Sequence, residues 1–336
     1  MKYFHYQQPF TLESGGQLPE LTIAYQTYGT LNADGSNVVW VCHALTANAA
    51  VTEWWPGLVG DNCAIDPAKY FIVCANIVGS CYGTTGPLSE NKETGRPYFH
   101  QFPFITIRDM VKAHQLLCSY LSINQIYLLV GGSMGGYQAL EWCCMEPQKI
   151  NQLFLIATAA RESAWGIAIH TSQRMAIESD GTWLHDVETA GQTGLKTARA
   201  IGMLTYRSFE TYAVHQSETD MSKINDFKAD SYIRYQGQKL QNRFNAFSYY
   251  LLTKAMDSHN VARGRAHSIE EVLKSVQQKT LIIGISSDLL CPSEELKKIA
   301  DAMPNATFYE IQSLYGHDGF LIEYGQISKH ILDWLA

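Results

Sequence analysis

Apolar runs rich in β-branched residues alternate with helical patterns along much of the chain. Such runs are typical of strands that are buried on both faces of a parallel sheet. The runs that predict strands are 37–45, 70–78, 125–132, 150–159, 279–286 and 306–312. Apolar residues recur at helical spacing in 106–121, and a last helix is expected near 319–335. The alternation predicts an α/β fold with a mostly parallel central sheet flanked by helices.

The strand pattern stops between residues 161 and 270, where helix-like segments such as "GLKTARAIGMLTYRSF" occur without a convincing buried strand. No repeat or low-complexity tract interrupts this stretch, which is therefore expected to be folded rather than a linker. We predict one core domain made of residues 1–160 and 271–336. Residues 161–270 are predicted to form a helical lid inserted into that domain.

Composition narrows the class of protein further. The 336 residues carry 32 acidic and 25 basic side chains and no Lys/Arg run, so nucleic acid is excluded as an expected partner. The N-terminus lacks the apolar core of a signal peptide, and no run approaches the roughly 20 apolar residues of a membrane span, so we expect a cytoplasmic protein. The eight cysteines lie mostly in apolar runs without CxxC spacing, which predicts neither disulfides nor a metal site.

One short motif carries the chemistry. Residues 131–135, Gly-Gly-Ser-Met-Gly, fit G-x-S-x-G, with an apolar strand directly before them and a helix-forming run directly after. In a nucleophile elbow the serine lies on a strained turn, and the small neighbours let the backbone pass close by. A glycine-rich turn with an uninvolved serine is the alternative, but both flanks favour the elbow. Ser133 is therefore the predicted nucleophile.

A serine needs a histidine base and a carboxylate that orients it, and in this fold they follow in the order Asp/Glu, then His. Asp288 comes directly after the strand predicted at 279–286, and His317 follows the next strand. Glu294 and Glu295 are alternative carboxylates, but they lie inside the next predicted helix. We therefore predict Asp288 and His317 as the partners of the serine.

The oxyanion formed during acyl transfer needs two backbone donors. The amide of Met134 is one, and the loop "VCHALTAN" supplies the second, for which we predict Leu45 with Thr46 as the close alternative. His43 in the same loop is predicted to brace it rather than to catalyse. The glycine-rich "GSCYGTTGP" lacks the ending of a phosphate loop, which argues against nucleotide hydrolysis.

The same three catalytic residues serve esterases, peptidases, thioesterases and acyltransferases, so these residues alone do not distinguish among the four activities. Seven segments in order between residues 42 and 321 resemble the homoserine O-acetyltransferase family of the α/β-hydrolase superfamily. They are "CHALTAN", "NIVGSCYGTTGP", "GGSMGGYQALEW", "GLKTARAIGMLTYRS", "DSHNVARGR", "SDLLCP" and "GHDGFL".

The resemblance implies an α/β-hydrolase fold and transfer of acetyl from acetyl-CoA to the hydroxyl of L-homoserine, in methionine biosynthesis. Ser133 would be acylated first in a ping-pong cycle, with CoA as a substrate and no resident cofactor or metal. Family members that use succinyl-CoA or serine keep those two alternatives open. A plain α/β-hydrolase esterase is an alternative of another kind.

The resemblance also assigns residues outside the catalytic three. Arg199 matches the family's substrate-binding arginine and is expected to bind the acceptor carboxylate. Asp318 matches the acidic residue that holds the acceptor, through its ammonium group. Tyr206, Thr46 and Arg207 are expected to line the same cleft. A homodimer joined through the lid helices is implied as well.

Overall fold

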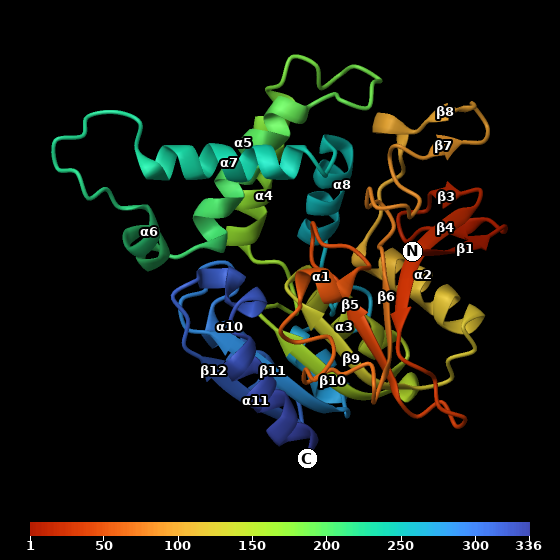
Figure 1. The fold of residues 1–336 in the computed structure, drawn as a ribbon. Coiled ribbons are helices and arrows are strands. Elements are labelled where there is room, and N and C mark those ends of the chain that lie inside the picture. Colours follow the sequence, from red (N-terminus) through yellow and green to blue (C-terminus); the bar gives the residue numbers. More distant parts are fainter.

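The computed structural model describes residues 1–336, which fold around an eight-stranded sheet in the order β1-β4-β6-β5-β9-β10-β11-β12 (Figure 1). Six neighbouring strands run parallel, which confirms the predicted mostly parallel sheet. They are β6 (Phe71–Ala75), β5 (Val38–Cys42), β9 (Ile126–Gly132), β10 (Ile150–Ile156), β11 (Lys279–Ile285) and β12 (Ala306–Ile311).

One edge of the sheet was not predicted from the sequence. There β4 (Leu21–Tyr28) runs antiparallel to β6, and β1 (Lys2–Tyr6) runs antiparallel to β4. No residue of β1 is fully buried, so the chain has no apolar run there that would predict a strand. Two small hairpins lie outside the sheet, β2 (Phe10–Thr11) with β3 (Gln17–Leu18) and β7 (Glu90–Asn91) with β8 (Arg96–Pro97).

The parallel strands send alternate residues into two separate cores. On β5, Trp40 enters one core and Val39 the other, and all five residues of this strand are buried. Helices α2 (Ile107–Tyr120), α3 (Met134–Met145) and α10 (Ser293–Ala302) contribute to the first core. Helices α1 (Val51–Trp54) and α11 (Tyr324–Leu335) contribute to the second. Burial on both faces explains why these strands are uniformly apolar in sequence.

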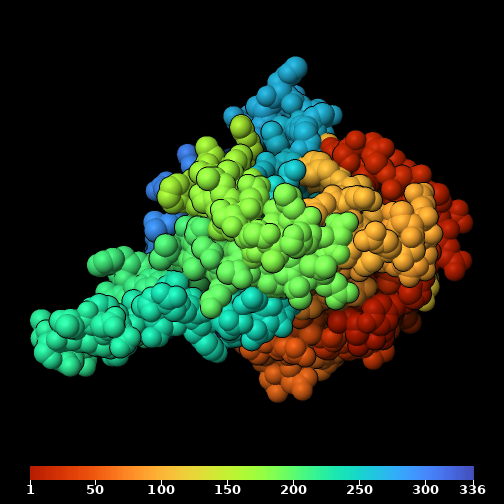
Figure 2. Space-filling model, turned by 90° about the horizontal axis from the view of Figure 1, so that it is seen from above, coloured from red at the N-terminus to blue at the C-terminus, as the bar shows by residue number.

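Helices α4 to α8 lie between β10 and β11, within the predicted insertion, and Figure 1 shows them standing above the sheet. They are α4 (Ala164–Glu178), α5 (Gln192–Tyr206), α6 (Phe209–Gln216), α7 (Lys228–Gln241) and α8 (Ala246–Asp257). The predicted boundary at 270 falls inside α9 (Ile269–Ser275), which leads into β11. Figure 2 shows α6 and the loop after it projecting from the body as an arm. No helix is both long and apolar enough to span a membrane.

The predicted last helix begins later than expected. Residues Gly316–Leu321 form a 3-10 turn, and α11 begins only at Tyr324. The indole N–H of Trp55 donates to the Phe320 carbonyl at 2.7 Å, which occupies an acceptor that a continuous α-helix would use. Two further 3-10 turns cover Phe99–Gln101 and Pro147–Lys149.

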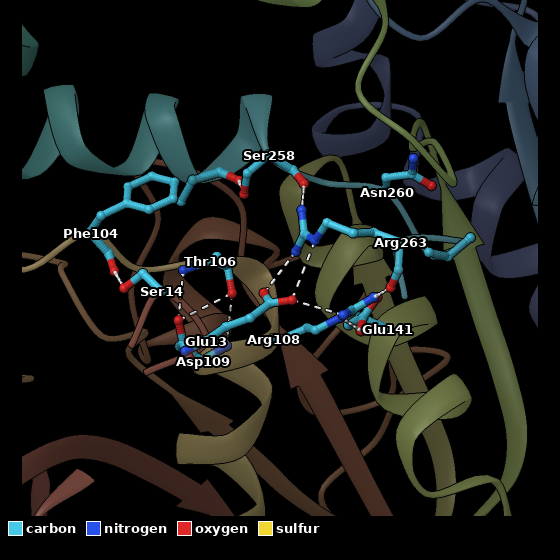
Figure 3. Close-up of polar contacts among 12 residues, drawn as sticks. Glu13, Ser14, Phe104, Thr106, Arg108, Asp109, Glu141, Ser258, Asn260 and Arg263 are labelled. Carbon is cyan, nitrogen blue, oxygen red and sulfur yellow. Dashed lines mark hydrogen bonds and ion pairs between the residues drawn. The ribbon is translucent and has the colours of Figure 1, made fainter. Parts of the chain in front are cut away.

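A partly buried ion network joins the N-terminal segment to helices α2 and α3 and to the segment after α8 (Figure 3). Arg108 on α2 reaches Glu13 at 2.8 Å and Glu141 on α3 at 2.7 Å. Arg263 pairs with Glu13 at 2.7 Å, and Arg265 pairs with Glu141 at 2.5 Å. Because the Glu141 side chain is only 1% exposed, its charge depends on these two arginines for compensation.

Replacing Glu141 by Ala should therefore lower the free energy of unfolding by about 3 kcal/mol, the range for breaking a buried pair. The change leaves the guanidinium groups of Arg108 and Arg265 without their shared carboxylate. Denaturant titration followed by tryptophan fluorescence measures the loss. Glu295→Ala, which removes an exposed pair with Lys298, is the matched control and should change little. Equal small effects from both substitutions would contradict a role for the network in stability.

Candidate active site

Ser133 occupies a strained turn between β9 and α3. Its φ of +55° and ψ of −130° are rarely adopted by a residue with a side chain. A Cβ atom on Gly131 would lie 2.2 Å from the Gly135 carbonyl oxygen, and one on Gly135 would lie 2.1 Å from the Cys42 carbonyl oxygen. Glycine is therefore required at both positions, because the backbone of another segment lies where a side chain would be. The Thr158 hydroxyl donates to the Ser133 carbonyl at 2.8 Å, which helps to hold the turn.

The structure brings together the three residues predicted from their order in the chain. Asp288 follows β11 and His317 lies in the 3-10 turn that follows β12. His317 Nε2 lies 2.8 Å from Ser133 Oγ, and His317 Nδ1 lies 2.7 Å from Asp288 Oδ2. The other carboxylate oxygen of Asp288 accepts hydrogen bonds from the backbone amides of Leu290 and Cys291. This arrangement can move a proton between the hydroxyl and the imidazole.

Electrostatics favour this use of His317. Burial lowers the pKa of the imidazole, but the adjacent Asp288 carboxylate outweighs it and raises the pKa above its usual value. Cys291 lies close enough to Asp288 and His317 for the three side chains to hold a metal ion. Burial, however, raises the pKa of the Cys291 thiol well above its usual value, which disfavours the thiolate that a metal binds.

Two backbone amides from different elements are the candidate oxyanion donors. Met134 is the first residue of α3, where an amide has no acceptor within the helix, and the Leu45 amide donates no hydrogen bond within the protein. Leu45 and Ser133 line the same cavity. His43 braces this loop, as predicted, because its buried ring accepts from the Ile77 amide at 3.2 Å and its Nδ1 lies 2.8 Å from the Ala44 carbonyl. Burial lowers the pKa of His43 to about 4, so its ring is neutral.

A cavity of about 650 Å³ opens above Ser133 between the core and the lid. Its lining includes these predicted site residues: Leu45, Thr46, Ser133, Arg199, Tyr206, His317 and Asp318. Asp288 and Met134 are buried behind the lining, and Arg207, which was expected in the cleft, is not among the residues that line it. Glu294 and Glu295 are exposed on α10 and take no part.

The two predicted acceptor-binding charges differ in their surroundings. The Arg199 guanidinium lies 5.1 Å above the ring of Tyr206 and forms no ion pair. Asp318 pairs with Arg207, with 2.9 Å between Oδ2 and Nε. Burial raises the pKa of Asp318, although Arg207 and Arg199 act in the opposite direction. Arg199 therefore offers the cleft a cation without an ion-pair partner, and Asp318 offers a carboxylate that would gain from a second positive charge.

Sequence reasoning missed several residues that line the cavity, among them His170, Lys239, Arg243 and Tyr82. His170 Nδ1 lies 2.8 Å from Asp257, which also binds Arg174 at 2.6 Å. His170 and Lys239 come from lid helices, Arg243 from the turn after α7, and Tyr82 from the loop after β6. Tyr82 lies in the glycine-rich segment 79–87, but nothing in the sequence there indicates a place in the cleft, so only the folded chain reveals the position of these residues.

Known proteins share the fold of this chain. Residues 37–324 match the α/β-hydrolase fold family. A solved homoserine O-acetyltransferase from Bacillus anthracis superposes with a TM-score of 0.91 at 26% identity, covering 99% of this chain and 96% of that one. An acetylester hydrolase from Corynebacterium glutamicum superposes with a TM-score of 0.87 at 22% identity, covering 100% and 96%, which shows the fold alone.

Sequence similarity is more specific than the fold. The chain is 49% identical over 324 residues to a homoserine O-acetyltransferase from Cyclobacterium marinum, which covers 96% of this chain and 92% of the relative. This identity extends through both the core and the lid. The chain therefore belongs to the homoserine O-acetyltransferase family of the α/β-hydrolase fold.

Proposed function

We propose that this protein transfers the acetyl group of acetyl-CoA to the side-chain hydroxyl of L-homoserine, a step in methionine biosynthesis. The 49% identity to a homoserine O-acetyltransferase over nearly the whole chain carries the proposal. The cleft supports it, because a serine, a histidine and an aspartate are in hydrogen-bonding contact at a cavity that Arg199 and Asp318 also line, a cation and a carboxylate suited to an amino acid.

In the first half-reaction, Ser133 Oγ attacks the thioester carbonyl while His317 Nε2 accepts the hydroxyl proton. The amides of Met134 and Leu45 donate to the oxyanion of the tetrahedral intermediate. The carbon–sulfur bond then breaks, and the imidazolium returns its proton to the sulfur of CoA. An acetyl ester of Ser133 remains, and free CoA leaves.

In the second half-reaction, His317 takes the proton of the homoserine hydroxyl as that oxygen attacks the acetyl ester. The same two amides stabilise the second tetrahedral intermediate. When it collapses, the imidazolium protonates Ser133 Oγ and O-acetylhomoserine is released. Asp288 holds the ring in the orientation that both transfers require.

The acceptor binds through its own charges. Arg199, which has no ion-pair partner, is assigned to the carboxylate of homoserine. Asp318 is assigned to the ammonium group, whose charge would favour the ionised form that burial opposes. With both ends fixed, the side-chain hydroxyl is directed to the acetyl ester rather than left to compete with water.

Acetyl is the preferred acyl group. A succinyl donor would place an additional carboxylate in the cleft, and that group needs a cation. The unassigned cations in the lining, Lys239 and Arg243, are exposed rather than buried beside Ser133. The cycle uses no metal or resident cofactor, because CoA enters and leaves as part of a substrate.

We also propose a homodimer that forms through the lid. Leu204 is 62% exposed, Phe209 80%, Met221 96% and Ile224 92%, and all four lie on α5, α6 or the projecting arm (Figure 2). A second copy of the chain would cover these apolar side chains. Light scattering of the purified protein tests this assembly. Both substrates are cytoplasmic metabolites, so we expect the enzyme in the cytoplasm, which cell fractionation would test.

Thiol release from acetyl-CoA tests the function directly. Release should be slow without an acceptor and should accelerate strongly with L-homoserine, but not with L-serine. Succinyl-CoA should be a poor donor. Equal release with and without an amino acid would mean that water is the acceptor and that the protein is a hydrolase.

Replacing Arg199 by Ala should raise the KM for homoserine at least about 30-fold, the effect of losing a charge-assisted contact worth about 2 kcal/mol or more. Acylation of Ser133 by acetyl-CoA should stay nearly unchanged, because the donor does not use this side chain. Steady-state kinetics and a single-turnover acylation assay separate the two effects. A parallel loss in both half-reactions would refute the assigned role.

The pH dependence of acylation should report His317. Only the neutral imidazole accepts the serine proton, so the rate should fall as the pH drops through a pKa above 6.5. In Asp288→Asn the main influence that raises the pKa of His317 is lost, while burial, which lowers the pKa, remains, so the acid limb should shift to lower pH. The maximum rate should also drop, by about 10³-fold or more. A limb that does not move would show that Asp288 does not set the pKa of His317.

A further inference from the structure

The loop that carries Leu45 is held from the protein interior. The Ala49 amide donates to the Asn76 side chain at 2.7 Å, and the Gln138 side chain donates to the His43 carbonyl at 3.0 Å. These contacts hold the two ends of the loop. Thr46, between these two ends, accepts no hydrogen bond from the core.

Arg243 of the lid holds Thr46. Its Nη1 donates to the Thr46 carbonyl and to the Tyr82 hydroxyl, both at 2.5 Å, and its Nη2 donates to the Thr46 hydroxyl at 3.3 Å. Neither oxygen of Thr46 has another partner, and no carboxylate pairs with Arg243. The side chain follows α7, so one exposed guanidinium connects the lid to the loop after β5 and the loop after β6.

We propose that Arg243 is a positioning residue for the oxyanion hole. Two of its hydrogen bonds fix Thr46, and the third ties the same guanidinium to Tyr82. Through the short backbone of residues 44–46, these contacts restrict the direction of the Leu45 amide. A donor must lie within about 3.1 Å of the developing oxyanion, and a misplacement of about 1 Å can cost about 100-fold in rate. The lid thereby completes the core's catalytic machinery as well as enclosing the substrate. The inference rests on the proposed acyl-serine chemistry.

Arg243 could instead serve the phosphates of CoA, because it is a cation in the cleft lining. The two roles differ in their dependence on the acyl donor. A positioning residue matters equally for acetyl-CoA and for p-nitrophenyl acetate, which carries no phosphate. A phosphate-binding residue matters only for acetyl-CoA.

The experiment measures single-turnover acylation of Arg243→Ala with both donors, with Arg234→Ala on the exposed part of α7 as the matched control. We expect a similar decrease of about 10- to 100-fold with both donors, an unchanged KM for homoserine, and partial recovery with added methylguanidinium. Arg243→Lys should retain part of the rate, because an ammonium can still donate to the Thr46 carbonyl. The control should match the unmodified protein.

Several results would overturn the inference: a decrease confined to acetyl-CoA, unchanged acylation, or a decrease that neither methylguanidinium nor lysine relieves. Tyr82→Phe provides a second test if Arg243→Ala does not fold, since it removes one acceptor of Nη1 and should slow both donors by a smaller factor. If the unmodified protein accepts the ester but not acetyl-CoA, the proposed function fails while the ester measurements still test Arg243.

Discussion

The approach of Gly135 to the Cys42 carbonyl is the contact on which the site depends. It brings the first turn of α3 against the end of β5, and any side chain at residue 135 would separate them. The two proposed oxyanion donors come from these two elements, Met134 from the helix and Leu45 from the loop after the strand. Ser133 lies between them on a strained turn. The surrounding strands stabilise that strain, because the serine amide donates to the Ile156 carbonyl of β10 at 3.1 Å.

The sheet then determines where the remaining catalytic groups can lie. Parallel strands end at a common edge, so loops after β11 and β12 bring Asp288 and His317 to the serine although 155 and 184 residues separate them along the chain. Burial would make the imidazole less basic, and the carboxylate reverses this effect. The basicity of His317 therefore depends on the Asp288 carboxylate, which stays close to the ring although both side chains are buried.

Sequence patterns predicted those parts of the molecule that local rules govern. Glycine spacing identified Ser133, and strand order identified Asp288 and His317, because each signal lies within a few residues of the group it concerns. The edge strand β1 escaped prediction because it is half-exposed and has no apolar run. The ion pair between Asp318 and Arg207 and the contact between Arg243 and Thr46 join distant segments. No periodicity encodes such pairs, so they emerge only when the lid is packed on the core.

The core alone cannot distinguish a transferase from a hydrolase, since an acetylester hydrolase shares the fold and the same chemistry serves both. What decides the fate of an acyl-serine is the competition between water and an alcohol at one carbonyl carbon. The groups proposed to bias that competition line one cavity, Arg199 and Tyr206 from the lid and Asp318 from the turn before α11. A lid that also orients the oxyanion loop through Arg243 would make acylation depend on the closed, water-poor arrangement. Specificity and rate would then both depend on the packing of the lid against the core. The acetyl ester of Ser133 would form only when the acceptor site is already assembled.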